Sequence, residues 1–386
     1  MNKTDNWDIR EYPYIDLTPD SSCDESARAW QGCPSVAVTK GGRVFAAWFT
    51  GGAFEPCINN YNLLVKSDDG GASFSSPLLT VGPDRDRRHR NIDAQLWIDD
   101  DNTLWLMWTV SPYYETSRPA SIREDIPRDY QREFPYTEVM KCTDPDAQTL
   151  LWSRPRILCE GFTRNKPVRL ASGRIIVPAY DYTGDKYTFR ISDDGSESFF
   201  TTTSDGKPDR CVYDEIALYE RTPNELYYIA RTNRGYYLSG ASKDGGNSWS
   251  RAEKYEDAPS SRAYIGVLGD GIVAYARNVS DKSRVGIKLC LSEDGGVSFP
   301  YEMMLDSRER VSYPDVAQDE RGNIYVIYDR ERDNRIKLDR ETWHSDAAKE
   351  ILLCRVTADD VRSGKLSDGS YLAHVISRAG QDEVLL

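Results

Sequence analysis

A short motif that recurs along the chain limits the folds that this sequence can adopt. Ser-x-Asp-Gly-Gly-x-Ser-aromatic begins at Ser67, Ser242 and Ser292, and a variant that begins at Ser192 has Ser196 in place of the second glycine. The copies at Ser192, Ser242 and Ser292 follow one another at intervals of fifty residues. A catalytic motif normally occurs once per site, whereas a motif repeated at a fixed period marks a repeated structural unit.

Six segments near these motifs share a second pattern: a short apolar run, a turn rich in Gly, Asn or Asp, and another apolar or aromatic run. This pattern predicts a β-hairpin, because the turn residues adopt positive φ at little cost. A further apolar run after each hairpin predicts a third strand. The hairpins are expected at 33–50, 93–109, 166–182, 214–232, 262–277 and 313–330, and the third strands at 62–67, 137–142, 186–192, 236–242, 286–292 and 350–356.

A unit of about 50 residues with four strands matches one blade of a β-propeller. We therefore predict an all-β fold, a six-bladed β-propeller of four-stranded antiparallel blades. A single propeller domain is expected at 30–386, with insertions on its top face near 109–136 and 330–349. The N-terminal segment 1–29, or the tail after Gly364, is expected to supply the strand that completes the last blade.

The repeated motif has a structural interpretation. Its Asp can accept hydrogen bonds from the backbone N–H groups of a tight turn, and its glycines adopt the dihedral angles of that turn. Its aromatic residue is expected to bury against the neighbouring sheet. The motifs lie at the end of each sheet opposite the start of the first strand. We interpret them as structural clips, in preference to a carboxylate cluster for catalysis or calcium.

Charge and hydropathy exclude several classes of partner. The chain has 62 acidic and 49 basic residues, a net charge of −13, which argues against nucleic acid and anionic membranes as partners. No apolar run reaches the length of about 18 residues that would span a bilayer. No secretory signal is visible at the N-terminus. We expect a cytoplasmic protein, or a secreted one if a signal has been removed.

The cysteines and histidines do not predict a metal site. Eight cysteines lie without a CxxC pair or a metal-ligand spacing, and the chain has three histidines. Several cysteines lie inside apolar runs and are expected to be buried thiols, with disulfides as the alternative. No metal or other cofactor is expected.

Aligning the six copies identifies residues that share one end of the central channel. In a propeller the first strands line the axis, so residues that enter strand one and leave strand two meet at the same end. Arginines gathered at one mouth of an acidic protein favour recognition of an anion, such as a carboxylate, by bidentate hydrogen bonds. The alternative is that these charges pair with one another. The candidates are Gln31, Glu55, Arg90, Asp93, Lys166, Glu215, Arg231, Arg262, Arg284, Tyr313 and Asp329.

From about Trp30 to Gly364, the sequence resembles the sialidase (neuraminidase) superfamily, whose six-bladed propellers carry such Asp boxes, also called BNR repeats. The resemblance implies that Tyr313, in SYPDVAQDERGNIYVIYDR, is the nucleophile and that Glu215, in YDEIAL, is its base. It also implies that Glu55, in FTGGAFEPCINNY, is the acid/base residue. Sialidases with a tyrosine nucleophile depart from the usual two-carboxylate scheme of glycosidases.

The resemblance further implies that arginines hold the substrate carboxylate. Arg231 and Arg284 match two of the family's three arginines, and Asp329 stands where the family usually has Glu. At the position of the first arginine this chain has Gly32, in WQGCP. Arg262, Arg90 or Lys166 is expected to replace that cation; otherwise the substrate is a different acidic sugar, such as a uronide.

The predicted function is therefore an exo-acting glycoside hydrolase of sialidase type that cleaves a terminal acidic sugar, sialic acid or similar, from a glycan or glycoconjugate. Two alternatives stay open: a glycosidase or lyase acting on uronic-acid-containing glycans, and a non-catalytic glycan-binding propeller. Tyr113, Tyr114 and Trp343, in the two insertions, are expected either to stack on sugar rings or to pack at the surface. The sequence leaves the oligomeric state open.

Overall fold

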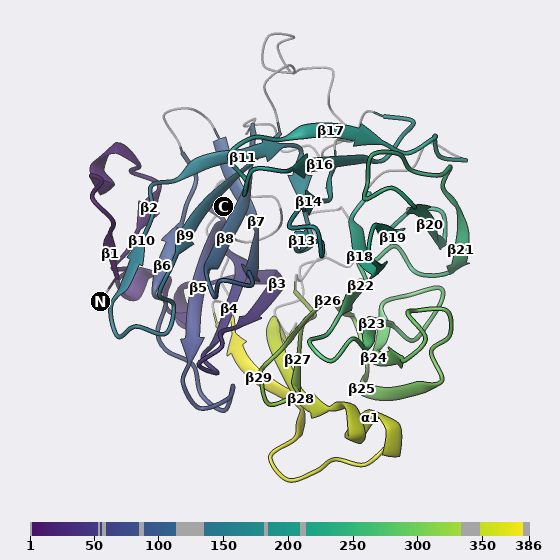
Figure 1. Ribbon diagram of the computed structural model, residues 1–386. Coiled ribbons are helices and arrows are strands. Elements are labelled where there is room, and N and C mark those ends of the chain that lie inside the picture. Colours follow the sequence, from purple (N-terminus) through teal and green to yellow (C-terminus); the bar gives the residue numbers. More distant parts are fainter. Residues whose placement is uncertain are drawn as a thin grey trace, which may run out of the picture.

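The described part of the chain forms six antiparallel sheets around a central axis (Figure 1), as a computed structural model shows. The structure describes residues 2–52, 55, 59–84, 89–112, 135–180, 184–208, 214–332 and 348–380. The prediction of a six-bladed propeller is confirmed. The central parts of the insertions, with Tyr113, Tyr114 and Trp343, lie outside the described residues.

Each blade is built from four consecutive strands of a meander, numbered outwards from the axis. The first two blades contain β3 (Trp30–Val38), β4 (Val44–Gly51), β5 (Tyr61–Ser67) and β6 (Leu79–Val81), then β7 (His89–Ile98), β8 (Leu104–Pro112), β9 (Tyr136–Cys142) and β11 (Arg156–Glu160). The third and fourth contain β13 (Val168–Arg169), β14 (Ile175–Val177), β16 (Thr188–Ser192) and β17 (Phe200–Thr203), then β18 (Ile216–Thr222), β19 (Glu225–Ala230), β20 (Tyr236–Ser242) and β21 (Glu253–Asp257). The last two contain β22 (Tyr264–Val267), β23 (Val273–Asn278), β24 (Val285–Ser292) and β25 (Tyr301–Glu309), then β26 (Val311–Gln318), β27 (Asn323–Arg330), β28 (Glu350–Thr357) and β29 (Tyr371–Arg378).

The two ends of the chain have different roles in the ring. The tail after Gly364 supplies β29, the fourth strand of the sixth blade, and α1 (Ala358–Ser363) leads into it. The N-terminal segment runs along the outer edges of the first two blades, where β2 (Ile15–Asp16) pairs with β6 and β1 (Asn2–Thr4) pairs with β10 (Leu150–Trp152). The remaining short elements are η1 (Ile9–Glu11), η2 (Ser21–Cys23), η3 (Glu25–Ala27), β12 (Phe162–Thr163) and β15 (Ala179–Tyr180).

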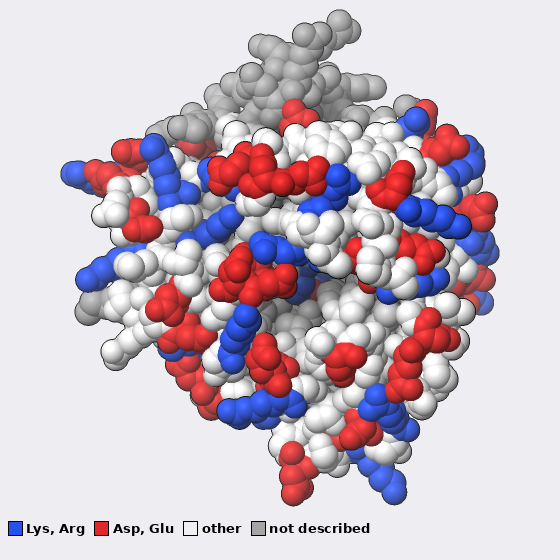
Figure 2. All heavy atoms as spheres, in the orientation of Figure 1, with Lys and Arg blue, Asp and Glu red and all other residues white. Residues whose placement is uncertain are grey.

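Apolar side chains fill the spaces between neighbouring blades. One cluster joins Val36 and Trp48 of the first blade to Ile327 and Leu353 of the sixth, and so closes the ring by packing as well as by chain connection. Among the described residues, no helix has the length and apolar character that crossing a membrane requires. Figure 2 shows acidic and basic side chains interspersed over the face in view.

The repeated motifs are clips, as the sequence indicates. In the copy at Ser242, Asp244 accepts hydrogen bonds from the hydroxyls of Ser242 and Ser248 and from the Ser248 backbone N–H. Trp249 stacks on Phe189 of the preceding blade at a centroid distance of 3.8 Å. The motifs at Ser67, Ser192 and Ser292 repeat the serine–aspartate bonds. Their carboxylates are therefore committed to holding turns.

The variant motif keeps the same turn without its second glycine. Ser196 has a φ of 81°, close to the 87° of Gly246 at the equivalent position. A serine there carries backbone strain that glycine avoids. Its hydroxyl oxygen accepts hydrogen bonds from Lys141 and Arg156 of the second blade, which offset that strain by joining the two blades.

Candidate active site

Bulges in three of the first strands direct side chains into the central channel. The pairing of β3, β7 and β26 with their neighbours shifts register around Cys33, Asp93 and Tyr313. These residues have left-handed φ angles of 56°, 61° and 58°, a conformation that costs a non-glycine residue about 1–3 kcal/mol and that is concentrated at functional sites. The six first strands surround the centre in Figure 1, so the three bulges face a common space.

Tyr313 lies at the centre of a short hydrogen-bonded chain. Its phenol donates to Glu215 Oε1 at 2.9 Å and accepts from Arg231 Nη1 at 2.7 Å. Arg231 Nη1 also lies 2.9 Å from Glu215 Oε2. Glu215 precedes β18 in the fourth blade and Arg231 follows β19, so the alignment of the repeats brings together residues almost 100 positions apart. All three side chains are nearly inaccessible to solvent.

The electrostatics of this group suit a phenol that loses its proton only during a reaction. Burial raises the pKa of Tyr313 to about 12, although Arg231 acts in the opposite direction. Burial also acts to raise the pKa of Glu215, but Arg231, Arg164 and Arg262 outweigh it and hold that pKa below its ordinary value. At neutral pH, the carboxylate of Glu215 is therefore ionised beside a neutral phenol, which is the arrangement of a general base and its proton donor.

Two further arginines approach the Tyr313 ring. The Cζ atoms of Arg284 and Arg332 lie 5.3 and 4.5 Å from the ring centroid, and that of Arg231 lies 5.8 Å away. Arg284 donates to the Ser260 carbonyl at 3.0 Å, and it forms no ion pair with any residue that the structure describes. A partly buried guanidinium with neutral partners is a favourable place for an anion.

Arg332 was not among the residues that the sequence indicated. It follows β27, and its Nη1 lies 3.6 Å from Glu55 Oε2, 3.9 Å from Asp329 Oδ2 and 3.0 Å from Cys33 Sγ. Asp329 is fully buried and accepts from the Cys33 N–H and the Ser312 hydroxyl. The one sequence signal for Arg332 is its spacing of three residues after Asp329.

Glu55, Asp93 and Cys33 form an acidic corner of the site. One ligand atom from each lies within 4.8 Å of the others. Burial raises the pKa of Asp93 to about 7, Glu55 and Glu215 add to that effect, and Arg164 opposes it through an ion pair. Metal coordination by these groups would have to displace the guanidinium of Arg332 from Cys33, so the donor set does not favour a cation.

Other predicted site residues lie apart from the Tyr313 group. Arg262 is fully buried beneath the bulges, where it donates to the carbonyls of Arg164, Pro34, Tyr313 and Pro314. Lys166 forms an ion pair with the buried Asp315. Gln31 is buried and donates to the Lys349 carbonyl at 2.6 Å. Arg90 donates to the Ser111 hydroxyl at 3.1 Å.

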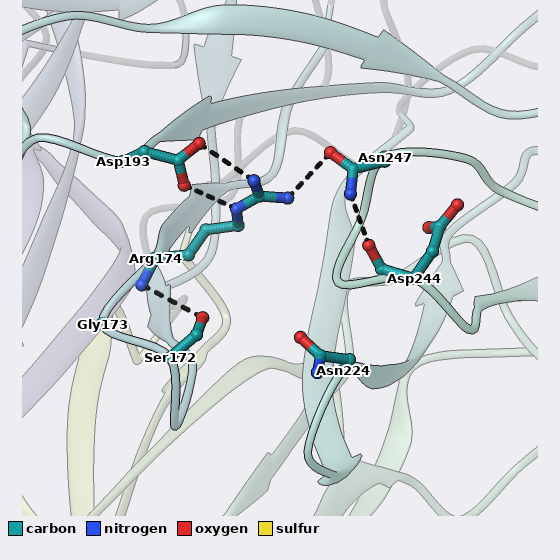
Figure 3. Close-up of a pocket in the computed structure, with 7 residues that line it drawn as sticks. All are labelled: Ser172, Gly173, Arg174, Asp193, Asn224, Asp244 and Asn247. Carbon is teal, nitrogen blue, oxygen red and sulfur yellow. Dashed lines mark hydrogen bonds and ion pairs between the residues drawn. The ribbon is translucent and has the colours of Figure 1, made fainter.

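A separate hollow of about 410 Å³ lies at the opposite end of the strands (Figure 3). Its walls are hairpin turns and Asp boxes of the third and fourth blades. Arg174 makes two bonds to Asp193, at 2.7 and 2.9 Å, and a third to Asn247 at 2.9 Å. Because its main cation is already committed to neighbouring side chains, we assign this hollow no function.

The six of the described residues that remain free cysteines also bear on chemistry. Cys33, Cys142, Cys159, Cys290 and Cys354 are buried, and Cys23 is partly exposed. Burial raises the pKa of the Cys33 thiol, so this side chain is a neutral thiol beside the Tyr313 group. Such a thiol is a poor nucleophile.

Comparison with known proteins places the fold. A family model described as a BNR repeat-like domain matches residues 42–326. The chain belongs to the BNR repeat-like family. The sequence matches no curated protein.

Solved structures that resemble this one include sialidases at low sequence identity. The intramolecular trans-sialidase of Ruminococcus gnavus, in complex with oseltamivir carboxylate, gives a TM-score of 0.68 at 16% identity over 90% of this chain and 98% of that chain. The NanB sialidase of Streptococcus pneumoniae gives 0.66 at 14% identity over 90% of this chain and 70% of that chain. A Dyadobacter fermentans protein of unknown function gives 0.60 at 20% identity over 83% and 96%. These likenesses establish a sialidase-like BNR propeller fold.

Proposed function

We propose that this protein is an exo-acting glycoside hydrolase of sialidase type, which cleaves a terminal sugar that carries a carboxylate. The observation that supports this most is the Tyr313 phenol, held between the carboxylate of Glu215 and the guanidinium of Arg231. A propeller that only bound glycans would have no need for an ionised base beside a buried phenol. The sialidase-like fold is consistent with the proposal.

In the first step, the Tyr313 oxygen attacks the anomeric carbon as the glycosidic bond to the leaving oxygen breaks. The phenol proton passes to Glu215 along their 2.9 Å hydrogen bond. The leaving oxygen takes a proton from Glu55, which is partly exposed at the rim of the site. The product of this step is a sugar linked covalently to Tyr313.

In the second step, water attacks the anomeric carbon and the bond to the Tyr313 oxygen breaks. Glu55 accepts a proton from the water, and Glu215 returns the phenol proton. The sum of the two steps is hydrolysis of one glycosidic bond, with both carboxyl groups restored.

A tyrosine nucleophile suits an anionic sugar. A carboxylate nucleophile would repel the carboxylate of the substrate, whereas the phenol is neutral until it reacts. The pKa of Tyr313, about 12, means that the free phenolate is scarce at neutral pH, so Glu215 must take the proton as the new bond forms. Arg231 and Arg284 are positioned to hold the substrate carboxylate against the Tyr313 ring.

A second candidate keeps the site and changes the sugar. Gly32 stands where the resemblance would place an arginine, so the carboxylate is not held in the way that the family holds sialic acid. This departure favours another carboxylated sugar, such as a uronide, as the substrate, cleaved either by hydrolysis or by elimination.

A panel of substrates tests the proposal. The purified chain is incubated with aryl sialosides, aryl uronides and neutral aryl glycosides, and released aryl alcohol is measured, with ultraviolet absorbance for the unsaturated product of a lyase. Release from a carboxylated glycoside and none from the neutral ones is expected. Release from neutral glycosides alone would refute the proposal, and an unsaturated product would show a lyase.

A further inference from the structure

We propose that Arg332 binds the substrate carboxylate together with Arg231 and Arg284, and that Gly32 is the residue that makes room for it. The ligand class is an acidic sugar held through its carboxylate. The inference deepens the proposed function and rests on it for the identity of that ligand.

The space around Gly32 supports the first part of the argument. A Cβ atom built at position 32 would lie 2.7 Å from Arg332 Cδ and 3.1 Å from Arg332 Cβ. Contacts below 3.0 Å force something to move. The stem of Arg332 therefore occupies the place from which any side chain at position 32 would have to start. The glycine and the arginine fit together, although 300 residues separate them.

The Arg332 guanidinium then reaches the reaction centre. Its Cζ lies 4.5 Å from the centroid of the Tyr313 ring, nearer than those of Arg231 and Arg284. Asp329, which is fully buried, lies 3.9 Å from Nη1 and fixes the orientation of the side chain. The side chain is 17% exposed, so it is partly accessible to a ligand.

The three arginines repel one another when no anion is present. Burial lowers the pKa of Arg284, and the positive charges of Arg332 and Arg231 lower it further. Arg332 likewise acts to lower the pKa of Arg231. A carboxylate between these guanidinium groups would relieve the repulsion and form charge-assisted hydrogen bonds, which are roughly twice as strong as neutral ones.

The other cations that the sequence suggested for this role have different partners. Arg262 donates to backbone carbonyls beneath the bulges, and Lys166 is paired with Asp315. Neither is directed to the side of the Tyr313 ring on which Arg332 lies.

Binding of two probes that differ at the carboxylate tests the proposal without any turnover. Oseltamivir carboxylate and its ethyl ester, oseltamivir, are titrated calorimetrically into Tyr313→Phe protein that carries Arg332 or Arg332→Ala. Loss of one charge-assisted partner weakens binding by about 10–100-fold. We expect that loss for the carboxylate, with a change below about 3-fold for the ester. Arg174→Ala, which removes a paired arginine at the opposite end of the strands, serves as the matched control and leaves both affinities unchanged.

The pairing with Gly32 is tested by moving the arginine. Gly32→Arg alone is expected to weaken binding of the carboxylate, because the two side chains compete for one space. The double variant Gly32→Arg/Arg332→Ala is expected to bind it within about 5-fold of the parent, because one arginine again fills that space. A double variant that binds no better than Arg332→Ala would overturn the link between the two positions.

The results separate this inference from the proposed function. Equal weakening of both probes in Arg332→Ala, or a parent protein with no preference for the carboxylate, would overturn the role of Arg332. Thermal unfolding of each variant shows whether the fold is intact, and Arg332→Lys retains the charge if the alanine variant does not fold. An Arg332-dependent preference without hydrolysis of any glycoside would refute the proposed function and leave the carboxylate site standing.

Discussion

Replacing Tyr313 by Phe removes one oxygen atom from the centre of the site and tests the proposed chemistry directly. That oxygen makes two hydrogen bonds, to Glu215 and Arg231, and its residue is 4% exposed. Without it, Glu215 keeps Arg231 as a partner but loses a donor. The expected cost is about 1–3 kcal/mol of unfolding free energy, the usual range for one buried group left without a partner. The ring itself remains, so the fold should persist.

The effect on catalysis is expected to be much larger than the effect on stability. General acid–base catalysis alone contributes about 10²–10⁴-fold, and the variant loses the nucleophile as well as the proton that Glu215 would accept. A fall in kcat/KM of at least about 10³-fold is therefore expected on the best aryl glycoside of the panel.

Tyr328→Phe is the matched control. Tyr328 is a fully buried tyrosine of the same blade, and its hydroxyl donates to a carboxylate, Asp306 Oδ2, at 2.9 Å. It should lose a similar amount of stability, measured by urea unfolding, and keep its activity. Equal turnover by Tyr313→Phe and the parent protein, or equal losses in the two variants, would refute the assignment of Tyr313.

Three other perturbations follow from the same contacts. Glu215→Gln should lower kcat by about 10²–10⁴-fold while the affinity for oseltamivir carboxylate stays within a few-fold, and unchanged kcat would exclude Glu215 as the base. Arg262→Met leaves four backbone carbonyls without their donor, so urea unfolding should show a loss of about 3 kcal/mol or more, and a loss below about 1 kcal/mol would contradict the structural role. The hydroxyls of Ser73 and Ser67 lower the pKa of Asp69 to about 2, so its stabilising effect is complete above about pH 4 and is lost as the pH falls towards 2. The stability difference between the parent and Asp69→Asn should accordingly shrink from pH 6 to pH 3, and a difference that grows would show the opposite linkage.

The repeat made much of the fold predictable. The six hairpins follow from local turn chemistry and apolar patterning, and their alignment places Tyr313 and Glu215 at equivalent points of different blades. Arg231 follows from the same alignment because it ends the second strand of its blade. These three residues lie within hydrogen-bonding distance in the structure, because equivalent positions in a closed ring face one axis.

Depth along the axis was not predictable from the repeat. The pairing of β22 with β23 has no register shift, whereas β26 bulges at Tyr313. A bulge inserts one residue and turns its side chain, and the apolar pattern does not reveal it. Arg262 and Tyr313 therefore align in sequence, yet Arg262 lies beneath the bulges and Tyr313 lies above them.

Arg332 could not be found from the repeat at all. It lies after the end of the last inner hairpin, at the start of an insertion with no counterpart in the other blades. Its proximity to Gly32 depends on how the first and sixth blades meet when the ring closes, which is a long-range contact. The absence of a side chain at position 32 was visible in the sequence, but the residue that fills the space was not.

The most direct test of the central claim is to identify the residue that carries the covalent intermediate. A carboxylated glycoside with fluorine beside the anomeric carbon and a good leaving group is incubated with the protein, because the fluorine slows the second step more than the leaving group slows the first. The protein is then digested and its peptides are analysed by mass spectrometry. We predict that the sugar is attached to the peptide that contains Tyr313 and that Tyr313→Phe is not labelled. A sugar attached to Glu55, or turnover of a carboxylated glycoside with no labelled peptide, would contradict the mechanism.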